Sequence, residues 1–196
     1  MTWMDFIMPS LKSVKWVVLL GVLLCLSCSA RGEQKNIRFM EKSVRANEQG
    51  LFLDAVVALR LSAEAEKALK SGVPLVWVMT VRVWRQREIL WNKKIAEVIC
   101  RYQISYHALM DVYRVTNEQN GTEKKFTSLQ VALNEMGVLN NIFIMADRLV
   151  VNKKQYIIGV LFALDKERLP LPLRPVAYYD AEWMLTSQWD LWSFQK

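Results

Sequence analysis

His107 is the only histidine in the chain, so a search for acid–base chemistry near neutral pH begins there. Ser105 precedes it by two positions and Asp111 follows it by four. On a strand, Ser105 and His107 would share one face, which would suit a serine–histidine–acid hydrolase. The sequence contains no glycine-flanked nucleophile turn and no glycine-rich oxyanion loop. We therefore expect His107 to be a structural or surface residue, with a small hydrolase as the alternative.

The sequence lacks the residue patterns that metal-binding, phosphate-binding and glycosidase sites need. Transition-metal sites use clusters of histidine and cysteine, and the chain has one histidine and three cysteines. Neither a calcium-loop spacing of acidic residues nor a phosphate-binding glycine motif occurs. No pair stands out among the aspartates that a glycosidase might use, namely Asp54, Asp111, Asp165, Asp180 and Asp190. The sequence therefore predicts a protein that is not an enzyme, without a catalytic, metal-binding or cofactor-binding site.

A stronger lead is a short stretch rich in tryptophan and arginine. It contains Arg82, Trp84, Arg85, Arg87 and Trp91, followed by two lysines. Guanidinium groups stack on aromatic rings, so these residues could form an internal cation–π ladder across neighbouring strands. Arginine and tryptophan are also enriched at the hot spots of protein interfaces, and a basic aromatic edge suits anionic lipid headgroups. An internal ladder, a protein interface and a membrane surface are three interpretations of this strip.

The first thirty residues have the pattern of a secretory signal. Lys12 and Lys15 precede an apolar run over residues 16–26, and small residues follow it. At about 1.5 Å per residue the run spans roughly half of a bilayer core, which is short for a stable transmembrane helix. Cleavage after Ala30 and lipidation at Cys28 are both consistent with the pattern, and an uncleaved anchor is a third outcome. All three place residues 31–196 in the periplasm or cell envelope, either soluble or lipid-anchored.

Charge and cysteine usage fit an exported domain. The formal net charge of +7 favours anionic partners such as lipid headgroups, and export makes nucleic acid an unexpected partner. Cys25 and Cys28 lie in the signal, so Cys100 is the remaining cysteine and an intramolecular disulfide is excluded after cleavage at Ala30. Cys100 falls on the apolar face of an expected strand, which predicts a buried and unreactive thiol.

Apolar residues recur with a period of two through much of the chain. Residues 51–61, 75–83 and 96–106 alternate in this way, which is typical of strands with one buried face. Residues 155–164 are apolar on both faces, so this strand should be central in its sheet or covered on both sides. We expect shorter strands at residues 37–46, 112–116, 124–126 and 183–187.

Two short helices interrupt these strands. Ser62 can cap the first, and Gly72 ends it. The second begins at Thr127 or Ser128, carries apolar residues at helical spacing and ends at Gly137.

The C-terminal part begins with a proline-dense segment, residues 169–175. Its prolines cannot donate to a sheet, so we expect an extended surface crossing there. Trp189 and Trp192 should pin the tail onto the domain. Together the elements predict a mostly β, antiparallel sandwich-like single domain over residues 31–196, preceded by the signal peptide or lipoprotein signal, residues 1–30.

Several motifs, specific only as a set, resemble one known family. They are Leu59-Arg60-Leu61-Ser62, Gly72-Val73-Pro74-Leu75, the strip from Val83 to Trp91, the segments 102–109 and 113–115, the proline segment 169–175, and Trp183, Leu185, Ser187 and Trp189 near the C-terminus. The chain resembles the domain-of-unknown-function 4390 family of exported proteobacterial proteins. The resemblance implies an envelope location and one compact domain, and it brings no activity or catalytic residue. Members tend to be encoded near a membrane sensor histidine kinase, which implies a link to membrane signalling.

These observations favour an exported envelope domain that works by binding, as an accessory to a membrane signalling protein such as a sensor kinase. The expected partner is an envelope protein, with an anionic membrane surface as the second choice. The alternatives from other classes are a small periplasmic hydrolase using His107 and a carrier of a lipid or other small molecule. A carrier would need a cavity between the sheets and helices.

Overall fold

The computed structural model describes residues 36–87, 91–147 and 154–195. The expected signal, residues 1–30 with Cys28, lies outside these residues. The chain divides into two units, Met1–Gln34 and Lys35–Lys196, and everything described below belongs to the second. Among the described residues, no helix has the length and hydropathy needed to cross a membrane.

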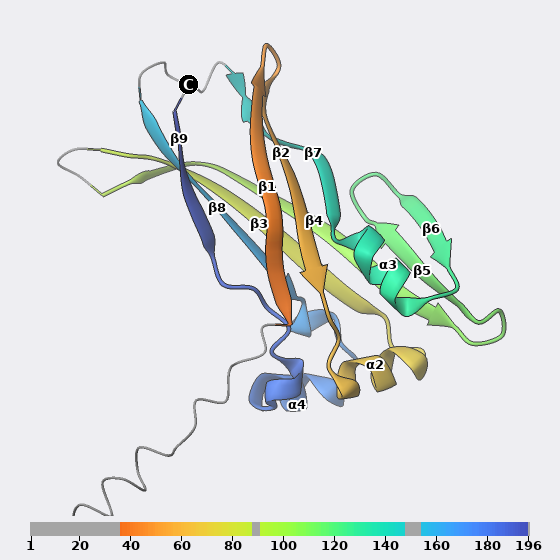
Figure 1. Ribbon diagram of the computed structural model, residues 1–196. Coiled ribbons are helices and arrows are strands. Elements are labelled where there is room, and N and C mark those ends of the chain that lie inside the picture. The colour runs from red at the N-terminus through yellow and green to blue at the C-terminus, as the bar shows by residue number, and fades with distance from the viewer. Residues whose placement is uncertain (1–35, 88–90, 148–153, 196) are drawn as a thin grey trace, which may run out of the picture. The chain divides into compact units, whose positions relative to one another are not determined.

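The second unit is built from two antiparallel sheets that pack face to face (Figure 1). The smaller sheet has the order β1-β2-β7 and the larger has the order β6-β5-β4-β3-β8-β9. The strands are β1 Ile37–Asn47, β2 Gly50–Leu59, β3 Leu75–Arg85, β4 Lys93–His107, β5 Val112–Asn117, β6 Thr122–Phe126, β7 Val138–Ala146, β8 Gln155–Leu164 and β9 Asp190–Gln195. The expected mostly β, antiparallel sandwich class is confirmed.

Short helices complete the unit. Helices α2, Ala63–Lys70, and α4, Leu173–Tyr179, lie at one end of the sheets, whereas α3, Leu129–Met136, packs against β2 and β5 (Figure 1). Two 3-10 turns, Lys166–Arg168 and Ala181–Trp183, flank α4. The expected cap of the first helix is present, since the Ser62 hydroxyl accepts a hydrogen bond of 3.2 Å from the amide of Ala65.

The core lies between the two sheets and is filled by the alternating apolar residues of the long strands. Trp77, Tyr156 and Phe162 are among its largest fully buried side chains. Each comes from β3 or β8, which are adjacent interior strands of the larger sheet. The opposite, outer face of β3 carries Arg82 and Trp84, which are half-buried. Because successive side chains of a strand point to opposite faces, these two residues lie on the face of the sheet that is turned away from the core.

The structure corrects three details of the expected elements. The strand expected at residues 183–187 is absent, because Trp183 ends a 3-10 turn and Thr186 makes a single bridge to Ala163. Strands β7 and β9 were not expected. The proline-dense segment is only partly extended, since α4 begins at Leu173, and the described residues thus hold three α-helices instead of two. Pro175 falls in the first turn of α4, where a missing amide hydrogen leaves no helical hydrogen bond unmade.

Candidate functional site

Arg82 and Trp84 form an internal contact with Trp189. The guanidinium carbon of Arg82 lies 4.9 Å from the centroid of the Trp189 ring, within the range of a cation–π interaction. The rings of Trp84 and Trp189 meet edge to face, with centroids 6.1 Å apart and an interplanar angle of 67°. We call these three residues the ladder. They tie the segment before β9 to the outer face of the larger sheet, which agrees with the expectation that Trp189 pins the tail.

A glycine makes room for the ladder. Gly159, on β8, lies opposite Arg82 in the sheet, and the Trp84 ring packs over its backbone. A Cβ atom at Gly159 would lie 2.8 Å from Cζ3 of Trp84 and 2.6 Å from Cδ2 of Leu191. Both distances are shorter than ordinary contacts between carbon atoms. The close packing of the indole therefore depends on the missing side chain at this position.

The charge of Arg82 is neutralised within the same face. Its Nε lies 2.5 Å from Oε1 of Glu97 on the neighbouring β4, and Lys94 Nζ lies 2.9 Å from Oε2 of the same carboxylate. The hydrogen bond from Arg82, followed by that from Lys94, lowers the pKa of Glu97 from its ordinary value. The guanidinium of Arg82 thus has an anionic partner on the neighbouring strand, which it shares with Lys94.

The other residues of the strip lie at the tip of the hairpin that joins β3 to β4. Arg85 is the last residue of β3, and it faces Lys93 on β4 and the buried Tyr156 on β8. Arg87 is half-buried beyond the end of β3, and Trp91 has 93 % of its surface exposed. In Figure 1 this tip lies at the opposite end of β3 from α2.

Lys154, the residue before β8, lies at the same end of the sheet. The amide of Gln86 donates a 3.0 Å hydrogen bond to the carbonyl of Gln155, so the pairing of β3 with β8 extends to the residue beside Lys154. Sequence reasoning did not single out Lys154, because its position depends on the register between β3 and β8. We call Arg85, Arg87, Trp91, Lys93 and Lys154 the hairpin end. Within the described residues, none of its four cations forms an ion pair.

The five residues of the predicted strip therefore do not form one continuous surface. Arg82 and Trp84 lie on the outer face of the sheet and contact Trp189. Arg85 has the opposite side-chain direction, since it pairs with the inward-facing Tyr156. The strip divides between the ladder and the hairpin end. In the part of the chain that the structure describes, the exposed ring of Trp91 and the cations without ion pairs belong to the hairpin end.

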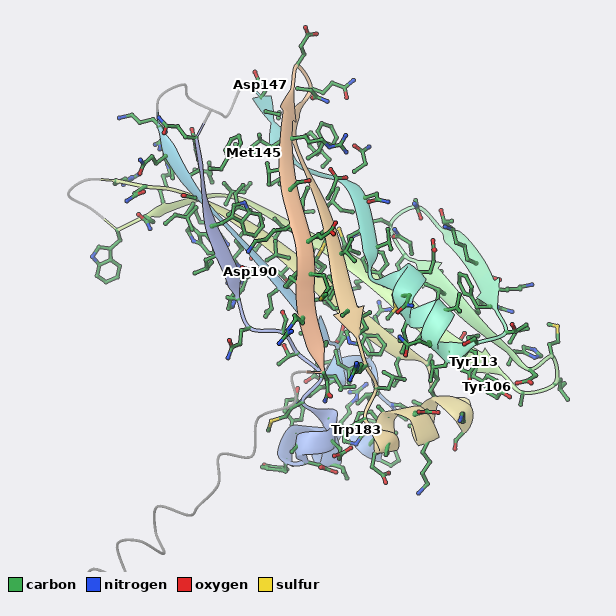
Figure 2. All side chains as sticks on the ribbon, viewed as in Figure 1. Tyr106, Tyr113, Met145, Asp147, Trp183 and Asp190 are labelled. Carbon is green, nitrogen blue, oxygen red and sulfur yellow. The ribbon has the colours of Figure 1, made fainter. Side chains whose placement is uncertain are left out.

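His107 ends β4 at the opposite end of the larger sheet. Its Nδ1 atom is buried and has no hydrogen-bond partner among the described residues. The nearby Asp111 accepts a 2.7 Å hydrogen bond from the Tyr106 hydroxyl, which raises the pKa of Tyr106. The centroid of the Tyr106 ring lies 4.9 Å from that of Tyr113. Figure 2 labels these two neighbouring side chains. In the described part of the chain, no hydrogen bond links His107 to Ser105 or to Asp111.

Two surface cavities border the sheets of the described unit. One of about 600 Å³ borders β1, β2 and β7, and is lined in part by Lys42, Asp54 and Asn140. The other, of about 150 Å³, lies between α3 and β5 and is lined in part by Tyr102 and Met136. Both are open to solvent, and neither touches the hairpin end.

Asp54, in the larger cavity, already has protein partners. Its carboxylate accepts hydrogen bonds of 2.6 and 2.9 Å from Arg45 and one of 2.8 Å from the amide of Asn141. The bond from Arg45, followed by that from Asn141, lowers the pKa of Asp54. Over residues 36–87, 91–147 and 154–195, no three metal-ligating side chains cluster. Cys100 is buried as expected, and burial raises the pKa of its thiol.

The match to a known family covers nearly all of the unit described above. A family model for a domain of unknown function, DUF4390, matches residues 34–193. The chain belongs to the DUF4390 family. In this DUF4390 domain the match includes the ladder, the hairpin end and His107. No curated protein and no solved structure matches the chain significantly.

Proposed function

We propose that this DUF4390 protein is an exported binding protein of the cell envelope, without enzymatic activity, that acts through the hairpin end. The observation that carries the proposal is Trp91, which is 93 % exposed beside cations that form no ion pair within the described residues. Tryptophan carries the largest apolar surface of any side chain, so leaving it in water forgoes about 2–3 kcal/mol of burial. A binding partner would recover that free energy.

The predicted export signal supports the same proposal. The charged, apolar and small-residue segments of residues 1–30 follow the order of a secretory signal. A protein processed at Ala30 would be soluble in the periplasm, whereas one lipidated at Cys28 would be anchored to a membrane. In either form the partner is an envelope component, and an accessory role beside a membrane sensor kinase is the form of this function that the family resemblance favours.

Photo-crosslinking in cells tests the proposal. A photoreactive phenylalanine derivative replaces Trp91 in one strain and Leu109 in another. Leu109 is a matched control because it is 95 % exposed at the tip of the β4–β5 hairpin, far along the sheet from Trp91. We expect a defined adduct, to lipid or to an envelope protein, from position 91 and none from position 109. Cell fractionation should place the protein in the envelope.

Two results would contradict the proposal. One is recovery of the intact chain, signal included, from the cytosol. The other is an equal pattern of adducts from positions 91 and 109, which would indicate random collision. The hydrolase alternative makes a different prediction: His107→Ala would reproduce the phenotype of a deletion strain, whereas Trp91→Ala would not.

A further inference from the structure

We propose that the hairpin end docks onto an anionic phospholipid bilayer, with Trp91 placed among the headgroups and the surrounding cations against lipid phosphates. This inference rests on the proposed function, because it names the partner of the same site. Its support is the combination of an exposed indole, that of Trp91, and a net positive charge on the described residues of the same hairpin.

The described residues at this tip carry only positive charge, and Glu88 is the one acidic residue that the sequence places in the hairpin, so the net charge is positive. Arg85, Arg87, Lys93 and Lys154 have no ion-pair partner in the described residues, whereas the cations around the ladder share Glu97. Lys93 and Lys154 are exposed, so their ammonium groups can reach a surface without any change in the fold. An anionic membrane surface attracts each such cation, and this attraction falls off within a Debye length. Charge complementarity therefore favours a negatively charged occupant.

The shape of the tip favours a lipid surface over a protein. A stable protein interface buries about 800 Å² on each partner, which requires a broad patch. The hairpin end offers one exposed ring at a turn between two strands, and its two arginines are half-buried. A bilayer needs no such patch, because a single tryptophan can enter the headgroup region, where indole rings are enriched in membrane proteins. Cations beside the ring then lie at the level of the phosphates.

Vesicle binding tests the inference. The protein is recovered from envelopes in its processed form and sedimented with vesicles of phosphatidylcholine containing phosphatidylglycerol, or of phosphatidylcholine alone. The variant Lys93→Gln/Lys154→Gln should bind the anionic vesicles about 25-fold more weakly, at about fivefold for each cation removed. Trp91→Ala should weaken binding by about tenfold. Molar salt should weaken the binding of the parent protein.

The matched control is Lys67→Gln/Lys125→Gln. These lysines are exposed and without ion pairs in the described residues, and they lie on α2 and β6, away from the hairpin end. The control removes the same charge, so it should bind like the parent. An equal loss in both double variants would overturn the inference, because net charge alone would then explain the binding. Equal binding to neutral and anionic vesicles would overturn it as well.

The outcomes separate this inference from the proposed function. If vesicles do not bind and position 91 still cross-links to one envelope protein, the lipid inference fails and the binding function stands. If vesicles bind as expected while the protein fractionates with the cytosol, the lipid affinity is real and the proposed function fails.

Discussion

The ladder and the hairpin end both combine tryptophan with basic residues and both include residues of β3, yet they differ in every contact. Trp84 packs against Trp189 and over Gly159, and the guanidinium of Arg82 lies between a ring and a carboxylate. Trp91 is exposed, and Arg85 and Lys93 face each other as like charges. The side chains of the ladder find their partners within the protein, whereas those of the hairpin end are left to interact with solvent or with another molecule.

The difference arises from the number of neighbouring strands. At Arg82, β3 lies between β4 and β8, and the segment leading into β9 crosses the outer face, so side chains find partners on both sides. Beyond the hydrogen bond from Gln86 to Gln155, no strand pairing continues among the described residues. A tryptophan and an arginine are therefore structural or available for binding according to whether a third strand continues beside them. Amino-acid composition alone does not distinguish a structural tryptophan–arginine contact from one that is available for binding.

The largest expected effect comes from truncating each tryptophan in turn. Trp84→Ala removes a half-buried ring and its edge-to-face contact with Trp189, so we expect the free energy of unfolding to fall by about 2 kcal/mol. Trp91→Ala removes an exposed ring and should change the free energy of unfolding by less than about 0.5 kcal/mol. Urea denaturation of both variants measures the two values. Similar losses in both variants would remove the distinction between ladder and hairpin end.

A medium effect is expected where the ladder meets β8. Gly159→Val would place a Cβ within 2.8 Å of the Trp84 ring, so the ring must move, and we expect a loss of about 1–2 kcal/mol. The matched control is Ser193→Val, an exposed position on the same outer face of β9. It should be nearly neutral, because a β-branched residue suits an exposed strand position. Thermal unfolding of both variants gives the comparison, and a neutral Gly159→Val would show that the ring does not need the glycine.

The sequence predicted the long strands well because each has one buried face. Residues such as Leu53 on β2 and Met79 on β3 repeat with a period of two, and that signal is local. Strand β7 was missed because Asn141 has a φ of 57° and its amide binds Asp54, which interrupts the alternation. Strand β9 was missed because the inward-facing Asp190 pairs with Lys42 of the other sheet. Neither partner can be inferred from the neighbouring sequence.

The candidate site shows the same limit. The sequence identified all five residues of the strip, because tryptophan and arginine stand out by type. It could not tell that Trp189 would contact Trp84, or that Lys154 would lie at the same end of the sheet as Arg85, since both depend on how distant strands align. The register between strands is set by the whole sheet. Whether an aromatic side chain is covered or exposed depends on that register, so the local sequence does not reveal it.

The smallest expected effect is the pH dependence of the ladder. The pKa of Glu97 is lowered from 4.5 by Arg82 and Lys94, so its ion pairs stabilise the fold fully above about pH 4.5, and this contribution is lost as the pH falls through the lowered pKa. Glu97→Gln should therefore flatten the decline of the melting temperature between about pH 5 and pH 3. The control Glu48→Gln removes an exposed carboxylate that has no ion pair in the described residues, and it should keep the parental slope. Because the pair is exposed, the flattening should be slight and should disappear in molar salt. An unchanged slope in Glu97→Gln would mean that the contact of Arg82 with Trp189, and not the carboxylate, holds the guanidinium in the ladder.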